Sequence, residues 1–228
     1  MSPGSLHLAL PRLLQLASPA LPVGAYTYSQ GLEWAIDAGI VGDPESAGEW
    51  IGGLLGEPLG RFELPLLARL HEAWRRDDRR EVERLNGDFL ASRESAELRA
   101  EAVQMGYSLR RLLGDLDDFA LPHCYAALPE VSFPAGWALA ASVWQIPPGD
   151  SLTGYLWSWA ENQVLAALKA VPLGQAAGQR ILLALGERIP PIVDAALDLP
   201  EARWSTFAPG LALASMRHET QYSRLFRS

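Results

Sequence analysis

The sequence is poor in lysine and cysteine, and each scarcity excludes a class of function or a feature of the fold. Among 19 basic residues, only Lys169 is a lysine. A phosphate-binding loop ends in Gly-Lys followed by Ser or Thr, whereas Lys169 follows Leu168 within a helical pattern. The chain is therefore not expected to be an NTPase. The single Cys124 excludes an internal disulfide and indicates a reducing, cytoplasmic compartment.

Histidine is also scarce, with four in the chain, and none has the spacing of a metal ligand set. Two His-Glu pairs, at residues 71–72 and 218–219, resemble the start of a zinc-protease motif. That motif needs a second histidine four residues after the first, so that both rings share one helix face. Arg75 and Tyr222 stand at those positions instead. We expect no catalytic residue, no cofactor and no bound metal.

Basic charge and long apolar runs are lacking as well. The net charge of −8 speaks against a nucleic-acid-binding protein, whose signature is a basic excess. The longest uncharged run, residues 131–149, has prolines near both ends and three polar side chains, so it predicts a buried helix and not a membrane span. The first ten residues have no basic group ahead of their apolar stretch, so no secretory signal is expected.

Helical periodicity dominates the 228 residues, and the alternation typical of strands never persists. A helix is predicted to begin after Asp43, with Asp43 as N-cap and Pro44 in the first turn. Pro190-Pro191 is expected to interrupt the last apolar stretch. The other expected helices lie at about 6–17, 26–38, 61–76, 79–90, 93–113, 134–145, 150–171, 173–185 and 192–197. These patterns predict an all-α fold: one helical-bundle-like domain of about ten helices over residues 1–214, with a flexible C-terminal tail over 215–228.

The predicted helix at 26–38 begins with aromatic and polar residues and has two distinct faces. Its inward face should contain Tyr28, Leu32, Ala35 and Ile36. Its outward face should contain Tyr26, Gln30, Glu33 and Asp37. The outward face is either a solvated surface, with Ser29 or Gln30 helping to cap the helix, or a surface for docking.

The predicted helix at 150–171 is apolar almost all round, and Glu161, Asn162 and Lys169 form one narrow polar strip on it. A buried lysine is costly unless it is paired. Lys169 therefore either pairs with a carboxylate inside the fold or reaches an interface, and the sequence leaves both open.

The last 14 residues combine arginines with apolar anchors and show no continuous apolar stripe. Tyr222, Leu225 and Phe226 are costly to leave in water, at roughly 1.5–3 kcal/mol each for such side chains. The pattern is typical of an interface segment that orders on binding. The alternative is a tail that packs on its own domain and belongs to the core.

Four unusual stretches follow one another along the chain: LLQLASPALPVGAYTYSQGLEWAIDAGIV (13–41), RESAELR (93–99), LKAVPLGQ (168–175) and MRHETQYSRLFRS (216–228). Together they resemble the UreF family of urease accessory proteins. The resemblance implies a non-enzymatic, all-helical homodimer that bridges the β-rich accessory protein UreD/UreH and the GTPase UreG on apo-urease for nickel delivery. On this basis the expected partner-binding residues are Tyr26, Tyr28, Ser29, Gln30, Glu33, Lys169, Gln175, Arg217, His218, Glu219, Tyr222, Arg224, Leu225 and Phe226.

Two other functions stay open at this point. One is a small-molecule enzyme with a helical-bundle pocket lined by some of the eight tryptophans. The other is a helical scaffold that has no influence on GTP hydrolysis. Whether the chain supplies an arginine to a partner's transition state is likewise open.

Overall fold

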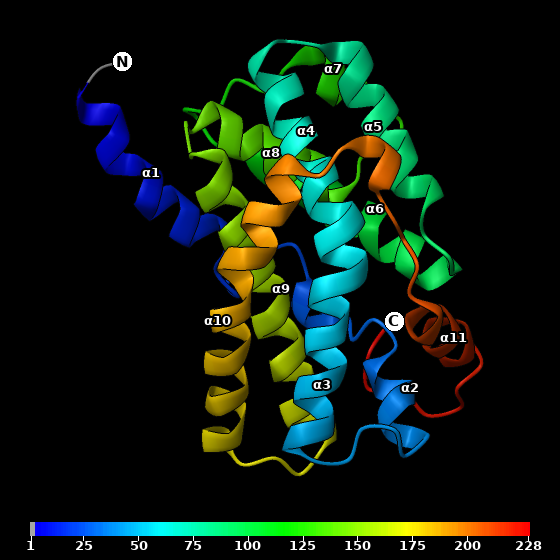
Figure 1. The fold of residues 1–228 in the computed structure, drawn as a ribbon. Helices are drawn as coiled ribbons and strands as arrows, with labels where there is room; N and C mark the ends of the chain where they lie inside the picture. Colours follow the sequence, from blue (N-terminus) through cyan, green and yellow to red (C-terminus); the bar gives the residue numbers. More distant parts are fainter. Residues whose placement is uncertain (1–2) are drawn as a thin grey trace.

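The computed structural model describes residues 3–228, with side chains from Leu8 onward, and every regular element in this range is helical (Figure 1). The predicted all-α fold is confirmed. Within residues 3–228, none of the helices is both long and apolar enough to cross a bilayer. The elements are α1 (Pro3–Leu16), η1 (Ala25–Thr27), α2 (Leu32–Asp37), α3 (Pro44–Leu54), η2 (Leu55–Glu63), α4 (Leu64–Arg75), α5 (Arg79–Ala91), α6 (Ala96–Gly114), α7 (His123–Ala126), α8 (Phe133–Val143), α9 (Pro148–Ala170), α10 (Gln175–Asp198), η3 (Glu201–Arg203) and α11 (Pro209–His218).

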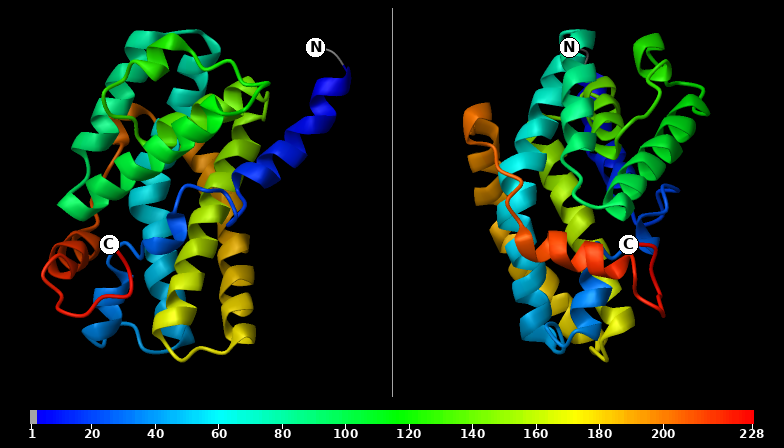
Figure 2. Two further views of the ribbon diagram at one scale, coloured as in Figure 1. Left: turned by 180° about the vertical axis from the view of Figure 1, so that it is seen from behind. Right: turned by 90° about the vertical axis from the view of Figure 1, so that its right-hand side faces the viewer.

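Long helices running side by side form the body of the molecule. The helices α9 and α10 form an antiparallel pair, and the continuous run of α3, η2 and α4 packs along them (Figure 1). At one end of the molecule α5 and α8 pack against α4, and α6 packs against α8, whereas α2 and α11 lie together on one flank beside the C-terminal segment (Figure 1). The left view of Figure 2 shows from behind that α1 projects away from the body.

The interior is filled mainly by leucines from several helices, which join in one hydrophobic core. The most deeply buried large side chains include Leu32, Ile51, Leu64, Leu67, Leu70, Leu85, Leu109 and Trp137. Because α8 and α9 contribute on several faces, their sequences are apolar nearly all round, as expected for central helices, whereas α4 buries its leucines and exposes Arg69 and Arg75.

The start of α3 follows its sequence closely. The Asp43 carboxylate accepts the Ser46 amide at 2.8 Å, and the Ser46 hydroxyl accepts the Asp43 amide at 3.2 Å. This reciprocal pair satisfies N–H groups that have no partner within the helix, and Pro44 in the first turn needs none. The predicted N-cap is confirmed.

The helix α10 runs unbroken through Pro190 and Pro191, so the predicted interruption there is wrong. Both prolines are exposed, which leaves the carbonyls that lose a hydrogen bond open to water. The buried side of the helix continues past them, from Leu185 through Ile189 to Val193. Packing of this apolar stripe outweighs the local cost of the two prolines.

Glycines allow α6 and α8 to approach closely, and Gly106 is the tightest case. A Cβ atom at Gly106 would lie 2.0 Å from the backbone carbonyl oxygen of Val131. We expect Gly106→Ala to lower the free energy of unfolding by about 3 kcal/mol or more, because backbone atoms must move to accept it. The matched control is Gly87→Ala in α5, where an added Cβ meets nothing within 4 Å. Helix propensity predicts a gain of up to about 1 kcal/mol there. Equal urea midpoints for the two variants would contradict the packing.

Candidate partner-binding site

The segment predicted as one helix from 26 to 38 is broken in the middle. Gln30 has φ +52° and Gly31 has φ +78°, so both residues are left-handed and α2 begins only at Leu32. The break has a tertiary cause. The Ser29 amide and hydroxyl both donate to a main-chain oxygen of Ser228, at 2.7 and 2.5 Å, so they are not available to a continuous helix. The Arg227 amide donates to the Thr27 carbonyl at 2.8 Å.

The carboxylate of Glu33 holds the C-terminal segment from the other side. Its two oxygens accept the amide of Leu225 at 2.6 Å and the amide of Phe226 at 2.9 Å. Glu33 is only 7% exposed, so the prediction that it lies on an outward helix face is wrong. The helix starts six residues later than expected and is turned by the left-handed pair, which directs Glu33 into the fold. Asp37, on the same helix, is exposed as predicted.

A fully buried histidine extends this cluster. His218 lies between two carboxylates, with Nε2 at 3.2 Å from Glu33 and Nδ1 at 2.7 Å from Glu97. A neutral imidazole has one N–H, so only the protonated ring can donate to both. Arg224 donates to the second oxygen of Glu97 at 2.6 Å. Glu219 accepts the Ala96 amide at 2.8 Å at the start of α6.

The C-terminal segment therefore packs on its own domain, in contrast to the flexible tail that the sequence predicted. Its first four residues end α11, and Phe226 and Ser228 are buried. The segment buries one large apolar side chain and is otherwise attached through hydrogen bonds, some from its backbone and some from polar side chains such as His218 and Arg224. Such attachment leaves no apolar stripe on a helical wheel, which explains why the sequence pattern did not show it.

The apolar anchors of this segment divide into two groups. Phe226 packs inward, whereas Tyr222 is fully exposed and Leu225 is 71% exposed. Arg217 is exposed as well. We use the name tail face for the exposed apolar side chains of α11 and its flanking residues, which are Phe207, Leu213, Met216, Tyr222 and Leu225.

Lys169 lies on the surface at the end of α9, next to aromatic rings. Its Nζ atom is 5.8 Å from the ring centre of Tyr26 and 5.7 Å from that of Phe226. It forms no ion pair with a carboxylate within the described part of the chain, so the buried-pair alternative is wrong. Gln175 is exposed at the start of α10, and its side chain makes no hydrogen bond to other described residues.

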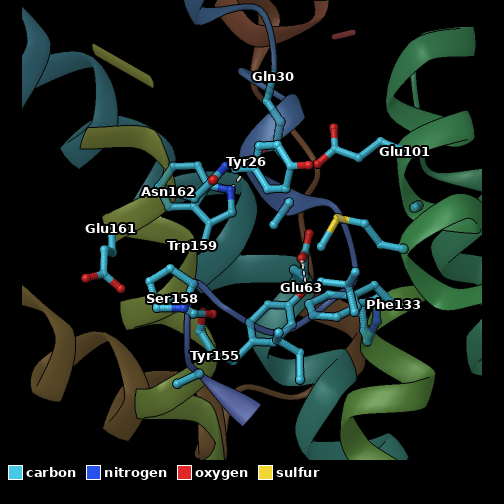
Figure 3. Close-up of a pocket in the computed structure, with 18 of the residues that line it drawn as sticks. Tyr26, Gln30, Glu63, Glu101, Phe133, Tyr155, Ser158, Trp159, Glu161 and Asn162 are labelled. Carbon is cyan, nitrogen blue, oxygen red and sulfur yellow. Dashed lines mark hydrogen bonds between the residues drawn. The ribbon is translucent and has the colours of Figure 1, made fainter. Parts of the chain in front are cut away.

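Beneath the loop at residues 28–31 lies a cavity of about 100 Å³ with aromatic walls (Figure 3). Gln30 spans its upper end. Its amide accepts a hydrogen bond from the Trp159 indole at 2.8 Å and donates one to Glu101 at 2.7 Å. Of the eight tryptophans only Trp159 lines the cavity. The alternative of a tryptophan-lined pocket thus finds no support in its walls.

Two buried acids at this cavity were not singled out from the sequence. Glu63 bonds the Tyr155 hydroxyl and pairs with Arg93 at 3.3 Å. Glu101 is 5% exposed, and burial raises its pKa to about 7, although Gln30 and Ser228 donate hydrogen bonds to it. The available signal was its position in α6, one helical turn from Leu98 and Met105 on an otherwise apolar face. Among the described residues, no cluster of three or more His, Cys, Asp or Glu side chains forms a metal site.

Comparisons with known proteins agree with the resemblance seen in the sequence. A profile of the UreF family matches residues 41–186. The chain is 64% identical over 225 residues to the urease accessory protein UreF of Azoarcus sp. (strain BH72), covering 97% of this chain and 96% of that protein. It is 60% identical to UreF of Dechloromonas aromatica (strain RCB), with 97% of this chain and 98% of that protein covered. For UreF of Methylobacillus flagellatus the identity is 53%, with 96% and 98% covered. The chain therefore belongs to the UreF family of urease accessory proteins.

Proposed function

We propose that this chain is a non-catalytic nickel-insertion chaperone of urease that bridges the accessory protein UreD/UreH and the GTPase UreG on apo-urease. In this role it couples GTP hydrolysis to nickel delivery. The observation that carries the proposal is the tail face, a set of exposed apolar side chains on a backbone that the domain itself holds in place. Family membership supplies the identity of the partners.

The tail face suits a docking role because its backbone is already ordered. Tyr222 and Leu225 expose apolar surface that is costly to leave in water. Because Glu33 fixes the Leu225 amide, binding need not pay for ordering this part of the chain. Arg217 adds a cation beside the anchors, which suits carboxylates or carbonyls of a partner. We assign this surface to UreD/UreH.

Buried members of the expected site act differently in this proposal. Tyr28, Ser29, Glu33, His218 and Phe226 are all buried within the domain. They contribute to partner binding by positioning the tail face, and they do not touch the partner. Glu219, which caps α6, and Arg224, which pairs with Glu97, have the same positioning role.

We expect the double variant Tyr222→Ala/Leu225→Ala to weaken binding to UreD/UreH by about 100-fold or more. A few central anchors usually dominate an interface, and two of them account for that factor. The melting temperature should stay unchanged, because both side chains are exposed. Titration calorimetry with purified UreD/UreH measures the affinity. The matched control is Leu183→Ala on α10, because Leu183 has the same exposed fraction of 71% and lies outside the tail face. Affinity equal to that of the control variant would refute the assignment of this surface.

Lys169 and Tyr26 are assigned to UreG. The lysine is exposed, has no carboxylate partner among the described residues and is flanked by two aromatic rings. Such a cation can meet a partner's carboxylate or phosphate without first breaking an internal pair. Gln175, exposed at the start of α10, is assigned to the same contact.

We expect Lys169→Ala to change the rate of GTP hydrolysis by UreG in the assembled complex at least several-fold, while the stability of the chain stays the same. The control is Arg80→Ala on α5, another exposed cation without an ion pair in the described chain. Phosphate release at fixed UreG concentration measures the rate. If UreG hydrolyses GTP at the wild-type rate in complexes with either variant, the chain is a scaffold without influence on GTP use.

The resemblance also leads us to propose a homodimer. The exposed leucines of the projecting helix α1, Leu10 and Leu14, offer apolar surface that the chain itself does not cover. The mode of association stays open.

A further inference from the structure

The buried acid Glu101 joins the loop at residues 28–31 to the C-terminal segment. One carboxyl oxygen accepts the Gln30 amide at 2.7 Å, and the other accepts the Ser228 hydroxyl at 2.8 Å. Ser228 is itself buried, and its main-chain oxygen accepts a hydrogen bond from Ser29. Thus one carboxyl group in the interior contacts both elements whose pairing holds the tail face in position.

We propose that Glu101 is a proton-controlled clamp: residues 225–228 are held firmly when Glu101 is protonated and loosen when it is ionised. The protonated carboxyl can still serve both neighbours. Its carbonyl oxygen accepts from Gln30, and its O–H donates to the Ser228 hydroxyl, which is able to accept.

The surroundings disfavour an ionised Glu101. From η2, Glu63 already carries a negative charge, and Arg93, in the turn after α5, is paired with it. From α9 and the loop, Tyr155 and Tyr28 face the site as neutral phenols. The facing helix α8 contains no charged residue.

Other charges near the site lie in groups that have their own partners. On α6, Glu97 is bonded to His218 and Arg224. In the C-terminal segment, the Arg227 guanidinium lies near the Tyr28 hydroxyl and acts to lower the pKa of that phenol, against the larger effect of burial. An ionised Glu101 would therefore be a second negative charge that shares one guanidinium with Glu63, in a site from which water is largely excluded.

The direction of the pH effect follows from burial. In the closed form burial raises the pKa of Glu101 to about 7. When the segment that contains Ser228 moves away, the carboxyl gains water and its pKa falls toward the ordinary glutamate value of roughly 4.3. The closed form therefore binds the proton more tightly, and its advantage is lost as the pH rises through about 7.

Gln30 is the residue that links Glu101 to the loop at residues 28–31, so a change at Glu101 would reach the loop through it. It is a non-glycine residue at φ +52°, a conformation that persists only where surrounding contacts hold it. Its side chain is fixed between Trp159 and Glu101 (Figure 3). Movement of the ionised Glu101 side chain toward water would remove one of these two contacts and free the loop whose Ser29 pairs with Ser228.

Hydrogen exchange of the isolated chain tests the clamp without any partner, so its outcome does not depend on the proposed function. Between pH 5.5 and pH 8, we expect the protection factors of the Leu225 and Phe226 amides, corrected for intrinsic rates, to fall about tenfold or more, from the pKa difference between closed and open forms. In Glu101→Gln the same protection factors should be nearly independent of pH. The matched control is Glu130→Gln, an exposed carboxyl paired with Arg99, which should behave like the wild type.

Histidines generally change charge in this pH range, and His218 contacts the same segment. The variant Glu101→Gln therefore distinguishes an effect of Glu101 from an effect of the histidine. A pH effect that persists in Glu101→Gln, or no pH effect in the wild type, overturns the proposal. Should that variant fail to fold, the carboxyl carbon shift of Glu101 in the wild type gives a second test. We expect its titration midpoint near 7 and coincident with the loss of amide protection. A midpoint near the ordinary glutamate value overturns the clamp.

Discussion

Replacing Glu33 with alanine is expected to lower the free energy of unfolding by about 3–5 kcal/mol, because three hydrogen bonds lose their acceptor and a buried donor left unpaired costs about 1–3 kcal/mol. The change leaves the buried His218 with one carboxylate instead of two. It also leaves the amides of Leu225 and Phe226, which donate to Glu33 in the folded chain, without an acceptor. Urea denaturation, followed by circular dichroism, measures the loss.

The matched control is Asp37→Ala, because Asp37 is an acid on the same helix but exposed and without a hydrogen bond in the described chain. It should change stability by no more than about 0.5 kcal/mol. If Glu33→Ala lowered the free energy of unfolding no more than Asp37→Ala does, Glu33 would be a surface residue. That result would contradict the hydrogen bonds by which Glu33 holds the tail face.

Deleting residues 219–228 is expected to cost about 4–6 kcal/mol and to abolish binding to UreD/UreH. Burial of Phe226 contributes roughly 2 kcal/mol, and the hydrogen bonds contribute about 1 kcal/mol for each of the three residues Glu33, Ser29 and Glu97. The loss of binding follows because Tyr222 and Leu225 leave with the segment. Differential scanning calorimetry and titration with UreD/UreH measure the two effects.

A flexible tail predicts a different result, namely lost binding with an unchanged melting temperature. That outcome would contradict the packed segment described above. The point variants separate the two roles within the segment, since Phe226→Ala should reduce stability, whereas Tyr222→Ala should reduce only binding.

Much of the fold could be predicted from the sequence, because local patterns of apolar and capping residues indicate where helices form. Apolar residues at helical spacing located the long helices, and Asp43 with Pro44 placed the start of α3. The predictions of helix boundaries were wrong where contacts with residues distant in the sequence determine the local structure. The bonds from Ser29 to Ser228 break the helix expected at 26–38, and packing on the far side of α10 carries that helix through Pro190 and Pro191.

The candidate site could be predicted in composition but not in arrangement. The sequence pointed to Glu33, His218 and the C-terminal residues, yet a single helix face cannot show that a carboxylate meets backbone amides almost 200 residues away. The backbone amides that bind Glu33 carry no sequence signal at all. Glu101 was missed because one acid on an apolar stripe is also compatible with a frayed or partly exposed position.

The nickel content of urease tests the central claim that this chain acts in urease maturation through an ordered tail face. Urease is purified from cells that produce its subunits and accessory proteins together with the wild-type chain, no chain, Leu183→Ala or Tyr222→Ala/Leu225→Ala, and nickel per active site is measured by mass spectrometry. We expect full nickel with the wild type and Leu183→Ala, and the same low nickel with the double variant as with no chain. Full nickel loading in cells without the chain, or with the double variant, would contradict the account.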